Sequence, residues 1–398
     1  MSATNTLLEP TVIAKEALRL FGNNLVMGNN VYREFKKEFV KIGSDVTIRK
    51  PVRFASGSAE SISGNVNNTV EMSTSISVDQ IRNVSWEFSG SDLTLTIDQY
   101  SKRYLEPAMV QLANDVDVSL TGLYKSVANC AGSAGVTPNS FKAIGDVNTK
   151  LDEFGTPKSG RNLVLNPDAT WSMMDALKGV FSEAMVNDFV KHGRLKTVAG
   201  MDIYGDQNVV QHSQATISGT PLIDEVGGVT YITAATADTS TIHVDGITTG
   251  DIVEGDVFTI ADVYAVNPIS KQSTGKLQQF TVTADVDQAA DMSLVVKPAL
   301  RASGAYQSVD AVPIAEAAVT FIGSHAANLA FHKNAFALVV VPMEVPKSAG
   351  WGARETYEDL SLRIVKGYNV TTNIETCRID VMYGVKVLYP ELACRLLG

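Results

Sequence analysis

Between residues 218 and 322 the chain loses the helical periodicity that marks the segments on either side. Thr, Val, Gly and Asp dominate this stretch, and turns separate short strand-like runs at 229–233, 241–244, 256–260, 279–283 and 293–296. Short strands with regular turns are typical of a small all-β barrel or sandwich. Because a mixed helix and strand pattern resumes afterwards, we expect an inserted domain. The chain should enter and leave it at neighbouring points on the host.

The same stretch carries most of the negative charge of the chain. Of a formal net charge of −10, residues 218–322 contribute 13 acidic and 4 basic residues, a net of −9. Residues 1–55 are mildly basic, with nine Lys/Arg against five Asp/Glu. An acidic domain repels a nucleic-acid backbone, and scattered lysines release few counterions. The charge pattern therefore argues against a conventional DNA-binding protein, although a protein that only encloses DNA needs no basic groove.

The strongest helix signal covers residues 98–129. Apolar residues recur there at steps of three and four, at Leu105, Met109, Leu112, Val116, Leu120, Leu123 and Val127. Such a stripe predicts a one-sided helix that packs against a sheet or another subunit. Pro107 fits only if the helix begins or kinks near it.

Two shorter helices are predicted. Residues 10–21 place Ile13, Ala17, Leu20 and Phe21 on one face, and residues 22–24 should end that helix. A second helix should start at Pro167 with Asn166 as its N-cap. Its expected apolar face is Trp171, Met174, Leu177 and Phe181.

Residues 43–97 have a strand pattern. Val46, Ile48, Val52 and Phe54 alternate with polar residues, as do Val84, Trp86 and Phe88 further on. Between them, residues 56–68 are rich in Gly, Ser and Asn. We expect a long two-stranded excursion with a mobile tip. A lone hairpin of this length is marginally stable, so it should lean on its own domain or on a neighbouring chain.

At 398 residues the chain is too long for one ordinary core, so we expect two or three domains, or one domain with a large insertion. A last long strand is expected at 377–388. The overall fold class is α+β. No signal peptide or membrane span is expected. Cys130, Cys377 and Cys394 are odd in number and form no CxxC, which favours thiols in a reducing cytosol over disulfides.

No catalytic, metal or cofactor site is predicted. The five histidines, 192, 212, 243, 325 and 332, lack the spacing of a zinc site and are expected to be exposed or locally satisfied. GxSxG is absent, residues 270–277 resemble a phosphate loop without its first glycine, and residues 285–291 lack the glycine of a calcium loop. Glu358 and Asp359 are expected on the surface, and Trp86, Trp171 and Trp351 as buried or interface anchors.

Three segments carry a resemblance to a protein family. Residues 195–204 (LKTVAGMDIY) are similar to a turn and strand of the axial domain of tailed-phage major capsid proteins, and residues 387–391 (VLYPE) to the closing strand of their peripheral domain. Residues 250–267 are similar to the insertion domain in the branch typified by short-tailed enterobacterial phages. With the order of segments, these motifs make the whole chain resemble a coat protein with the Hong Kong 97-type fold.

The resemblance implies a domain map and a role. It gives an N-terminal arm at 1–42, an extended loop at 43–97, a spine helix and peripheral domain at 98–165, axial segments at 166–217 and 323–373, the inserted domain at 218–322, and a closing strand at 374–398. The implied function is a structural subunit that assembles as hexamers and pentamers into an icosahedral head. The implied partners are a scaffolding protein, a portal protein and double-stranded DNA bound without sequence specificity, with assembly in the host cytoplasm.

The resemblance also suggests inter-subunit contact residues. By position on the extended loop and its flanks these are Arg49, Lys50, Arg53, Glu60 and Trp86. Some relatives cross-link a loop lysine to a neighbour's asparagine, and Lys50 is placed for this, although the branch with the insert generally lacks the cross-link.

Three other functions remain open from the sequence. A cellular nanocompartment shell of the same fold would need a cargo pocket and no scaffold. A carbohydrate-binding or hydrolytic protein would need an aromatic platform on the insert, where only Tyr231, Tyr264 and Tyr306 are available. A tail or decoration protein is disfavoured by the long one-sided helix.

Overall fold

The structure is a computed structural model that describes residues 10–34, 45–54, 71–89, 101–177, 195, 197–224, 238–346, 351–369 and 374–398. The chain forms two compact units. The first unit comprises Met1–Thr47, Ser75–Leu120 and Phe336–Lys386, and the second comprises Ile48–Thr74, Thr121–Ala335 and Val387–Gly398. Each unit is therefore assembled from segments that are distant in the sequence.

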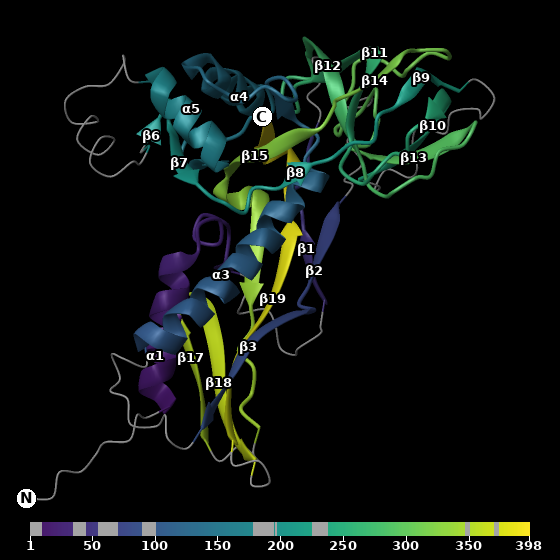
Figure 1. Ribbon diagram of the computed structural model, residues 1–398. Coiled ribbons are helices and arrows are strands. Elements are labelled where there is room, and N and C mark those ends of the chain that lie inside the picture. Colours follow the sequence, from purple (N-terminus) through teal and green to yellow (C-terminus); the bar gives the residue numbers. More distant parts are fainter. Residues whose placement is uncertain are drawn as a thin grey trace, which may run out of the picture. The chain divides into compact units, whose positions relative to one another are not determined.

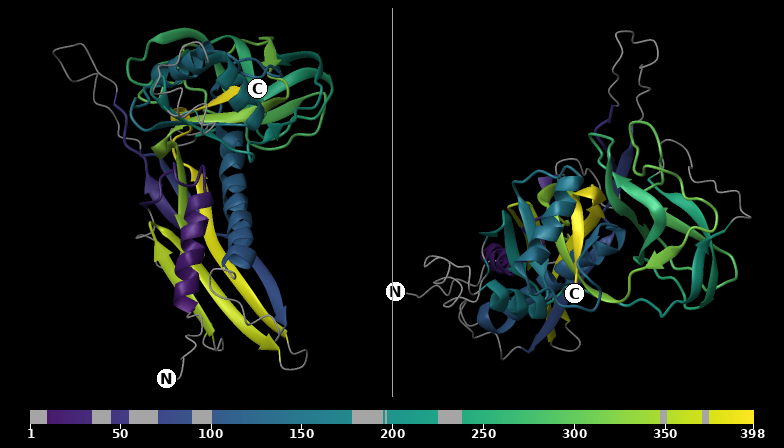
Figure 2. Two further views of the ribbon diagram at one scale, coloured as in Figure 1. Left: turned by 60° about the vertical axis from the view of Figure 1, so that its left-hand side comes forward. Right: turned by 90° about the horizontal axis from the view of Figure 1, so that it is seen from above.

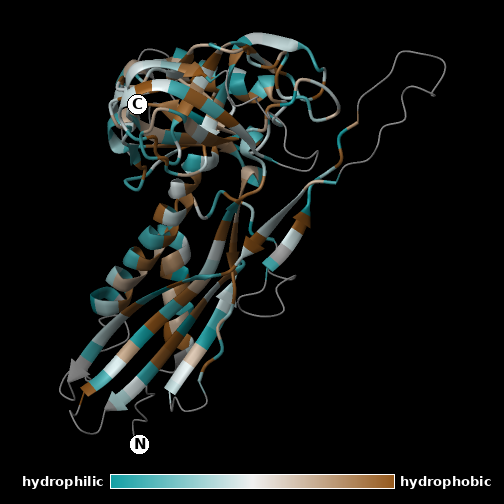
Figure 3. Cartoon of the chain, turned by 90° about the vertical axis from the view of Figure 1, so that its right-hand side faces the viewer, coloured by the Kyte–Doolittle hydropathy of each residue, from teal (hydrophilic) through white to brown (hydrophobic). Residues whose placement is uncertain are grey.

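The first unit is built on a five-stranded sheet (Figure 1). Its strand order is β16 (Phe336–Val340), β19 (Ile374–Val387), β18 (Leu360–Asn369) and β17 (Trp351–Tyr357), and β3 (Gln80–Ser89) also pairs with β19. The long strand predicted at 377–388 is confirmed as β19. Figure 3 shows hydrophobic and hydrophilic segments alternating along these strands, as expected where successive side chains point to opposite faces of a sheet.

A buried carboxylate joins two strands of this sheet. Asp380 of β19 is 1% exposed and lies opposite Arg363 of β18 in the antiparallel register. Its Oδ2 accepts a hydrogen bond of 2.6 Å from Arg363 Nη2, and its Oδ1 accepts one of 2.5 Å from Arg378 Nε. Two cations therefore offset the burial of one anion.

Helix α1 (Pro10–Asn24) packs on β17 and β18, and the left view of Figure 2 shows it lying along the sheet. The predicted helix is confirmed but continues three residues further, through Gly22. Ile13, Ala17 and Phe21 are buried as expected, whereas Leu18 is buried in place of the half-buried Leu20. The apolar face is therefore rotated slightly from the predicted one.

The predicted helix at 98–129 is shorter than expected. A π-helical turn (η4, Ser101–Leu105) precedes α3 (Glu106–Thr121), and a 3₁₀ segment (η5, Gly122–Ser126) follows it. The first five apolar positions, from Leu105 to Leu120, are fully buried. Because a 3₁₀ turn has fewer residues than an α-turn, the face shifts in η5, and Tyr124 is buried instead of Leu123. Pro107 is the second residue of α3, directly after the π-helical turn, so the change of helix type falls at the proline as the sequence suggested.

Helix α3 also anchors other parts of the first unit. The Ser119 hydroxyl lies 2.8 Å from the Tyr383 hydroxyl of β19, so the helix packs on the sheet as predicted. On its other side the buried Asp117 carboxylate accepts hydrogen bonds from the backbone N–H groups of Val26, at 2.7 Å, and Gly28, at 2.9 Å. This carboxylate fixes the segment that follows α1.

The extended excursion differs from its prediction. Strands β1 (Asp45–Arg49) and β2 (Ser73–Ser77) form a two-stranded sheet, so β2 is the returning strand. Val84 and Trp86, predicted as that strand, lie on β3 and pair with Ile379 and Cys377 of β19. Alternating polarity identifies a strand but contains no information about its partner. The predicted tip, 56–68, lies outside the described residues.

The second unit contains a seven-stranded sheet. Its order is β4 (Cys130–Ala131), β20 (Ala393–Leu397), β15 (His325–His332), β5 (Arg161–Leu165), β7 (Met201–Gly205) and β6 (Thr197–Val198), with β8 (Gln211–His212) paired to β15. Strands β6 and β7 form a hairpin whose turn residues Ala199 and Gly200 both have positive φ, as tight hairpins require. The turn and strand expected at 195–204 are therefore present.

Two helices contribute to the core of this sheet. Helix α4 (Phe141–Glu153) and helix α5 (Pro167–Leu177) share one hydrophobic cluster with the sheet. Asn166 caps α5 as predicted, because its Oδ1 accepts a 2.9 Å hydrogen bond from Ala169 N–H. The predicted apolar face of α5 is wrong at Trp171, which is 68% exposed, whereas Met174 is buried as predicted and Ala169 and Met173 are buried beside it. Phe181 lies outside the described residues.

The expected inserted β barrel is confirmed as a six-stranded sheet in order β14-β11-β12-β13-β10-β9. A bridge between Leu222 and Ala318 joins the two end strands, so the barrel is nearly closed. Its own core includes the stacked rings of Phe258 and Phe280. The strands are β9 (Ser218–Ile223), β10 (Ser240–Thr249), β11 (Val257–Val266), β12 (Ser273–Val282), β13 (Met292–Lys297) and β14 (Val319–Phe321). The sequence did not predict β9 and β14, and the predicted run at 229–233 lies outside the described residues.

The five-stranded and seven-stranded sheets divide several of the expected domain ranges between them. Residues 374–398 contribute β19 to the five-stranded sheet and β20 to the seven-stranded one. Residues 323–373 are divided in the same way, since β15 belongs to the seven-stranded sheet and β16, β17 and β18 to the other. Helix α4 and β5, expected with the spine helix, belong to the seven-stranded sheet and its core. No helix in the described ranges combines the length and hydropathy needed to cross a membrane.

Candidate functional site at the neck of the inserted domain

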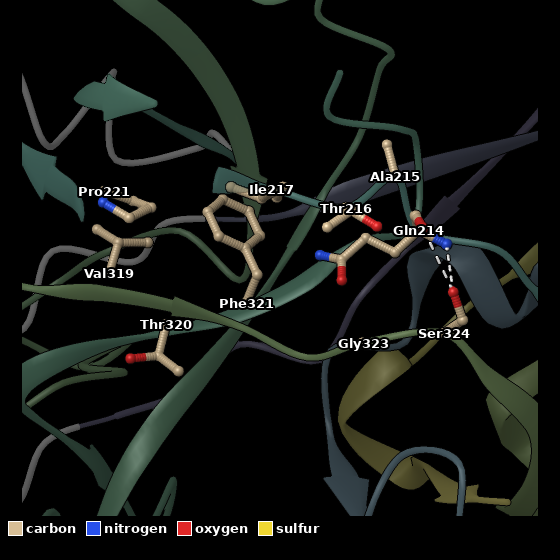
Figure 4. Close-up of a pocket in the computed structure, with 10 residues that line it drawn as sticks. All are labelled: Gln214, Ala215, Thr216, Ile217, Pro221, Val319, Thr320, Phe321, Gly323 and Ser324. Carbon is tan, nitrogen blue, oxygen red and sulfur yellow. Dashed lines mark hydrogen bonds between the residues drawn. The ribbon is translucent and has the colours of Figure 1, made fainter. Parts of the chain in front are cut away.

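The chain passes between the host sheet and the inserted domain through two short segments, residues 213–217 and 322–324, which we call the neck. His212 ends β8 before the first segment, and His325 begins β15 after the second. The two histidines are paired in the antiparallel register of β8 and β15. The Ser324 hydroxyl joins the two segments, because it accepts a hydrogen bond from Gln214 N–H and donates one to Gln214 O (Figure 4).

A shallow pocket of about 420 Å³ lies along the neck. Figure 4 shows Ile217, Pro221, Val319 and Phe321 on its apolar side, with Gln214 and Ser324 at the opposite end. Ile217 and Phe321 also pack against the core of the inserted domain. The pocket therefore follows the seam at which the two end strands of the barrel separate.

Below the neck a buried hydrogen-bond chain connects the host to the inserted domain. The Tyr124 hydroxyl lies 2.9 Å from His212 Nδ1, and His212 Nε2 lies 2.8 Å from Asp256 Oδ1. Burial raises the pKa of Tyr124, which keeps its hydroxyl protonated and able to donate to Nδ1. His212 Nε2–H then donates to the Asp256 carboxylate, whose Oδ2 accepts from Val253 N–H at 3.0 Å. Every member of this chain therefore has a hydrogen-bond partner.

Arg395 is the buried cation of the same region. It belongs to β20 and has no exposed surface. Its guanidinium donates to Val127 O at 2.7 Å, to Gly255 O at 2.8 Å and to Thr281 Oγ1 at 3.2 Å, and it lies 5.0 Å from the centre of the Tyr124 ring. Burial lowers its pKa, but the ordinary value is so high that the group stays charged. Because Gly255 and Thr281 belong to the insert, Arg395 ties the C-terminal strand to the inserted domain.

His325 is buried beside this network and is neutral. Its Nδ1 lies 2.8 Å from Gly323 O and therefore carries the proton. Its ring centre lies 5.2 Å from that of His212. Burial lowers the pKa of His325 to about 4. The structure shows no hydrogen-bond partner for its Nε2 among the described residues.

Further contacts extend the docking surface around Arg395. The side-chain amide of Gln279, on β12, accepts from Cys130 N–H at 2.8 Å and donates to Cys130 O at 3.1 Å. Lys125 pairs with Glu254 at 2.9 Å, and Asn267 Nδ2 donates to Glu153 O at 2.7 Å. Cys130, Val257 and Leu397 form a small apolar cluster. The insert is therefore held by side chains as well as by the neck.

The predicted contact residues do not gather at one place. Arg49 and Glu71 form an ion pair at 3.1 Å, and both side chains are largely exposed. Lys50 pairs with Asp238 of the insert at 3.0 Å. Trp86 is half-buried on β3 opposite Cys377, and Glu60 lies outside the described residues.

Arg53 has the most contacts of this group. Its guanidinium binds Glu391 at 2.7 Å and lies 5.9 Å from the centre of the Tyr306 ring. Arg301 contacts the same ring at 5.7 Å. The base of the extended loop is thus attached to the insert and to the 3₁₀ turn η7 (Pro390–Leu392) of the same subunit.

All three cysteines lie in the described part of the chain and are buried as thiols. Burial raises the pKa of Cys130 to about 11, so the thiol stays protonated and unreactive. Among the described residues no group of His, Cys, Asp and Glu is arranged to hold a metal ion. His192 lies outside them, and His243, on the insert, bonds Ser293 at 3.0 Å.

Sequence reasoning did not find the neck network. It treated His212 and His325 as isolated residues and gave no role to Asp256 or Arg395. The sequence separations explain this, since Arg395 is 268 residues from Val127 and 140 from Gly255. No local spacing connects such residues.

Comparisons with known proteins assign the chain. The family model described as "P22 coat protein - gene protein 5" matches residues 1–398, the whole chain. A search of curated protein sequences gave no match. Among solved structures, a chain of Mycobacterium phage Che8 is 12% identical, with a TM-score of 0.48 over 94% of this chain and 90% of that one. The capsid of Ralstonia phage GP4 is 10% identical, with a TM-score of 0.45 over 90% and 84%.

A third structure corresponds to part of the chain. The CUS-3 coat protein I-domain is 28% identical over 28% of this chain and 96% of that one, with a TM-score of 0.17. The assignment depends on the family model, which covers every residue. The chain therefore belongs to the P22 coat protein family, and it is a bacteriophage coat protein, a structural component of an icosahedral capsid.

Proposed function

We propose that this coat protein assembles as hexamers and pentamers, with the help of a scaffolding protein, into a procapsid that later encloses double-stranded phage DNA. The observation that carries this proposal is the match of the coat-protein family to the whole chain. A portal protein at one vertex is the expected route for the DNA. Assembly is expected in the host cytoplasm, which agrees with three cysteines buried as thiols.

In this proposal the five-stranded sheet with α1 and α3 is the peripheral domain and its spine helix. The seven-stranded sheet with α4 and α5 is the axial domain, and β1 and β2 form the base of the extended loop. The inserted domain has a net charge of −9, which disfavours contact with DNA phosphates. We therefore expect the insert on the outer surface and DNA enclosed without sequence-specific contacts.

Contacts between subunits are expected at the extended loop. Among the predicted contact residues, Arg49 is the best placed, because 79% of its side chain is exposed and its partner Glu71 is also exposed. Lys50 and Arg53 have partners within the subunit, so they would act mainly by holding the loop base. Glu60 and Trp86 remain proposals by position. Many weak contacts of this kind let one sequence occupy slightly different environments in a shell.

Electron microscopy of the purified protein, produced with and without its scaffolding partner, tests this proposal. Uniform closed shells that require the partner support it. Shells that form without any partner would favour a nanocompartment shell, and monomers under both conditions would contradict an assembly role.

Charge reversal refines the test. Arg49→Glu should reduce the yield of shells while the subunit stays folded. Lys142→Glu, at a cation 83% exposed on α4, is the matched control and should assemble normally. Normal shells from Arg49→Glu would remove this residue from the proposed interface.

A further inference from the structure

The neck places two buried histidines side by side, with their rings tilted by 46°, where the chain enters and leaves the inserted domain. His212 is 3% exposed and His325 is fully buried, and their rings are 5.2 Å apart. Histidine is the side chain whose ordinary titration range lies nearest to neutral pH. Protonation of a histidine here would therefore add charge at the connection between the inserted domain and the seven-stranded sheet.

The charged and titratable groups around His325 come from several elements. His212 comes from β8, Asp256 from the turn before β11, and Arg395 from β20. Tyr124, from η5, bonds His212 and contacts the Arg395 guanidinium. With both histidines neutral, these groups contain one cation, Arg395, and one anion, Asp256.

A proton on His325 would disturb this balance. The Nε2–H would have no acceptor among the described residues, and an unsatisfied buried donor is costly. The new cation would also lie in the region that already holds Arg395, in a medium that screens charge poorly. The neutral state of His325 is therefore part of what holds the insert in place.

We propose that the neck is an acid-sensitive latch, in which protonation of His325 weakens the docking of the inserted domain on the seven-stranded sheet. The contacts that would open are those that cross between the two parts. They are the His212–Asp256 hydrogen bond, the Arg395–Gly255 hydrogen bond and the paired Cys130–Gln279 amide contacts. The barrel has its own hydrophobic core and would remain folded.

The direction of the effect follows from the folded and unfolded states. In the docked state the pKa of His325 is lowered to about 4 from its ordinary 6.5. When the neck opens, the histidine regains its ordinary affinity for protons. Its contribution to docking is therefore complete above about pH 6.5 and is lost as the pH falls towards 4. Each pH unit in this window can change the docking equilibrium by up to about tenfold.

Hydrogen exchange of the full-length protein between pH 7 and pH 4.5, corrected for the intrinsic rate, tests the latch. The Cys130 amide, which donates to Gln279, reports docking, and the Ile223 amide, which donates to Ala317 O, reports the barrel itself. The Cys130 amide should lose protection by roughly ten- to a hundredfold between pH 6.5 and 4.5. The Ile223 amide should keep its protection.

Two variants identify the responsible group. His325→Asn keeps a donor for Gly323 O and cannot titrate, so the pH dependence at Cys130 should largely disappear. His243→Asn removes a histidine of the insert that bonds Ser293 and is not part of the neck network, and the pH dependence should stay as in the wild type.

Constant protection at Cys130 across this pH range would overturn the proposal. So would an unchanged loss of protection in His325→Asn, because another group would then be responsible. If His325→Asn does not fold, an NMR titration of His325 in the wild type decides. A midpoint near the ordinary histidine value would contradict the latch, and a midpoint well below it would support it.

Discussion

The two units of this coat protein differ in the charges that they bury: the buried charged residues described in the first unit are anions, whereas the second unit buries cations as well. In the first unit the buried charges are anions, Asp380 held by two arginines and Asp117 held by two backbone N–H groups. Of the buried cations in the second unit, Arg395 is held by carbonyls, a hydroxyl and an aromatic ring. The anion Asp256 is held by the His212 ring, which Tyr124 bonds in turn, and by the Val253 N–H group.

The difference lies in what each charge connects. Asp380 joins neighbouring strands, since Arg363 is 17 residues away and Arg378 is two residues away. Arg395 joins segments up to 268 residues apart and ties the inserted domain to its host. A buried charge is weak evidence for stability in itself, but removal of its partners is strongly destabilising. Each charge should therefore stabilise the elements that it connects.

The largest effect is expected at Arg395. Arg395→Met leaves the carbonyls of Val127 and Gly255 without a donor and should lower the free energy of unfolding of the second unit by about 3–5 kcal/mol. Urea denaturation followed by tryptophan fluorescence measures it. Arg354→Met, at an exposed arginine on β17, is the control and should change stability little. A loss of less than about 1 kcal/mol for Arg395→Met would mean that the insert is docked mainly by other contacts.

Asp380→Asn tests the local arrangement in the same way. The substitution leaves Arg363 and Arg378 without a counter-charge. Because Arg378 is half exposed, the free energy of unfolding should fall by about 3 kcal/mol, at the lower end for a broken buried pair. The effect should be confined to the first unit, which hydrogen exchange of β18 and β19 can resolve. Asp359→Asn, in the exposed turn between β17 and β18, should have no measurable effect. If Asp380→Asn increased hydrogen exchange equally at the neck amides, the Asp380 network and the neck network would not be independent.

The backbone-held anion should matter less. Asp117→Ala leaves the N–H groups of Val26 and Gly28 without their acceptor, at an expected cost of about 1–3 kcal/mol. Thermal unfolding would report the change. Asp115→Ala, on the same helix, removes an exposed hydrogen bond with Gln111 and provides the comparison. Equal losses in both variants would mean that burial of Asp117 is not the cause.

The smallest effect is expected at the edge of the neck network. The Lys125–Glu254 pair crosses from host to insert, yet both side chains are over 40% exposed. A double-mutant cycle of Lys125→Ala and Glu254→Ala should give a coupling of less than about 1 kcal/mol. A coupling as large as the effect at Arg395 would mean that this exposed ion pair contributes as much to docking of the insert as the buried arginine does.

Much of the architecture could be predicted from local patterns. The stripe from Leu105 to Leu120 identified α3, the strand at 377–388 identified β19, and Asn166-Pro167 identified the start of α5. The loss of helical periodicity at 218 identified the inserted barrel. The Hong Kong 97-type fold expected from the order of segments is confirmed, as is the family of the chain.

The sequence by itself determined the type of the long helices and strands and most of the buried face of α1 and α3, because those properties repeat over a few residues. Only the tertiary structure decided the partners. It paired β3 with β19 instead of with β1, and it gathered Tyr124, His212, Asp256 and Arg395 at one neck. Periodicity describes the environment of a segment. The partner of a segment can lie hundreds of residues away in the chain, and no local pattern encodes which distant segments meet.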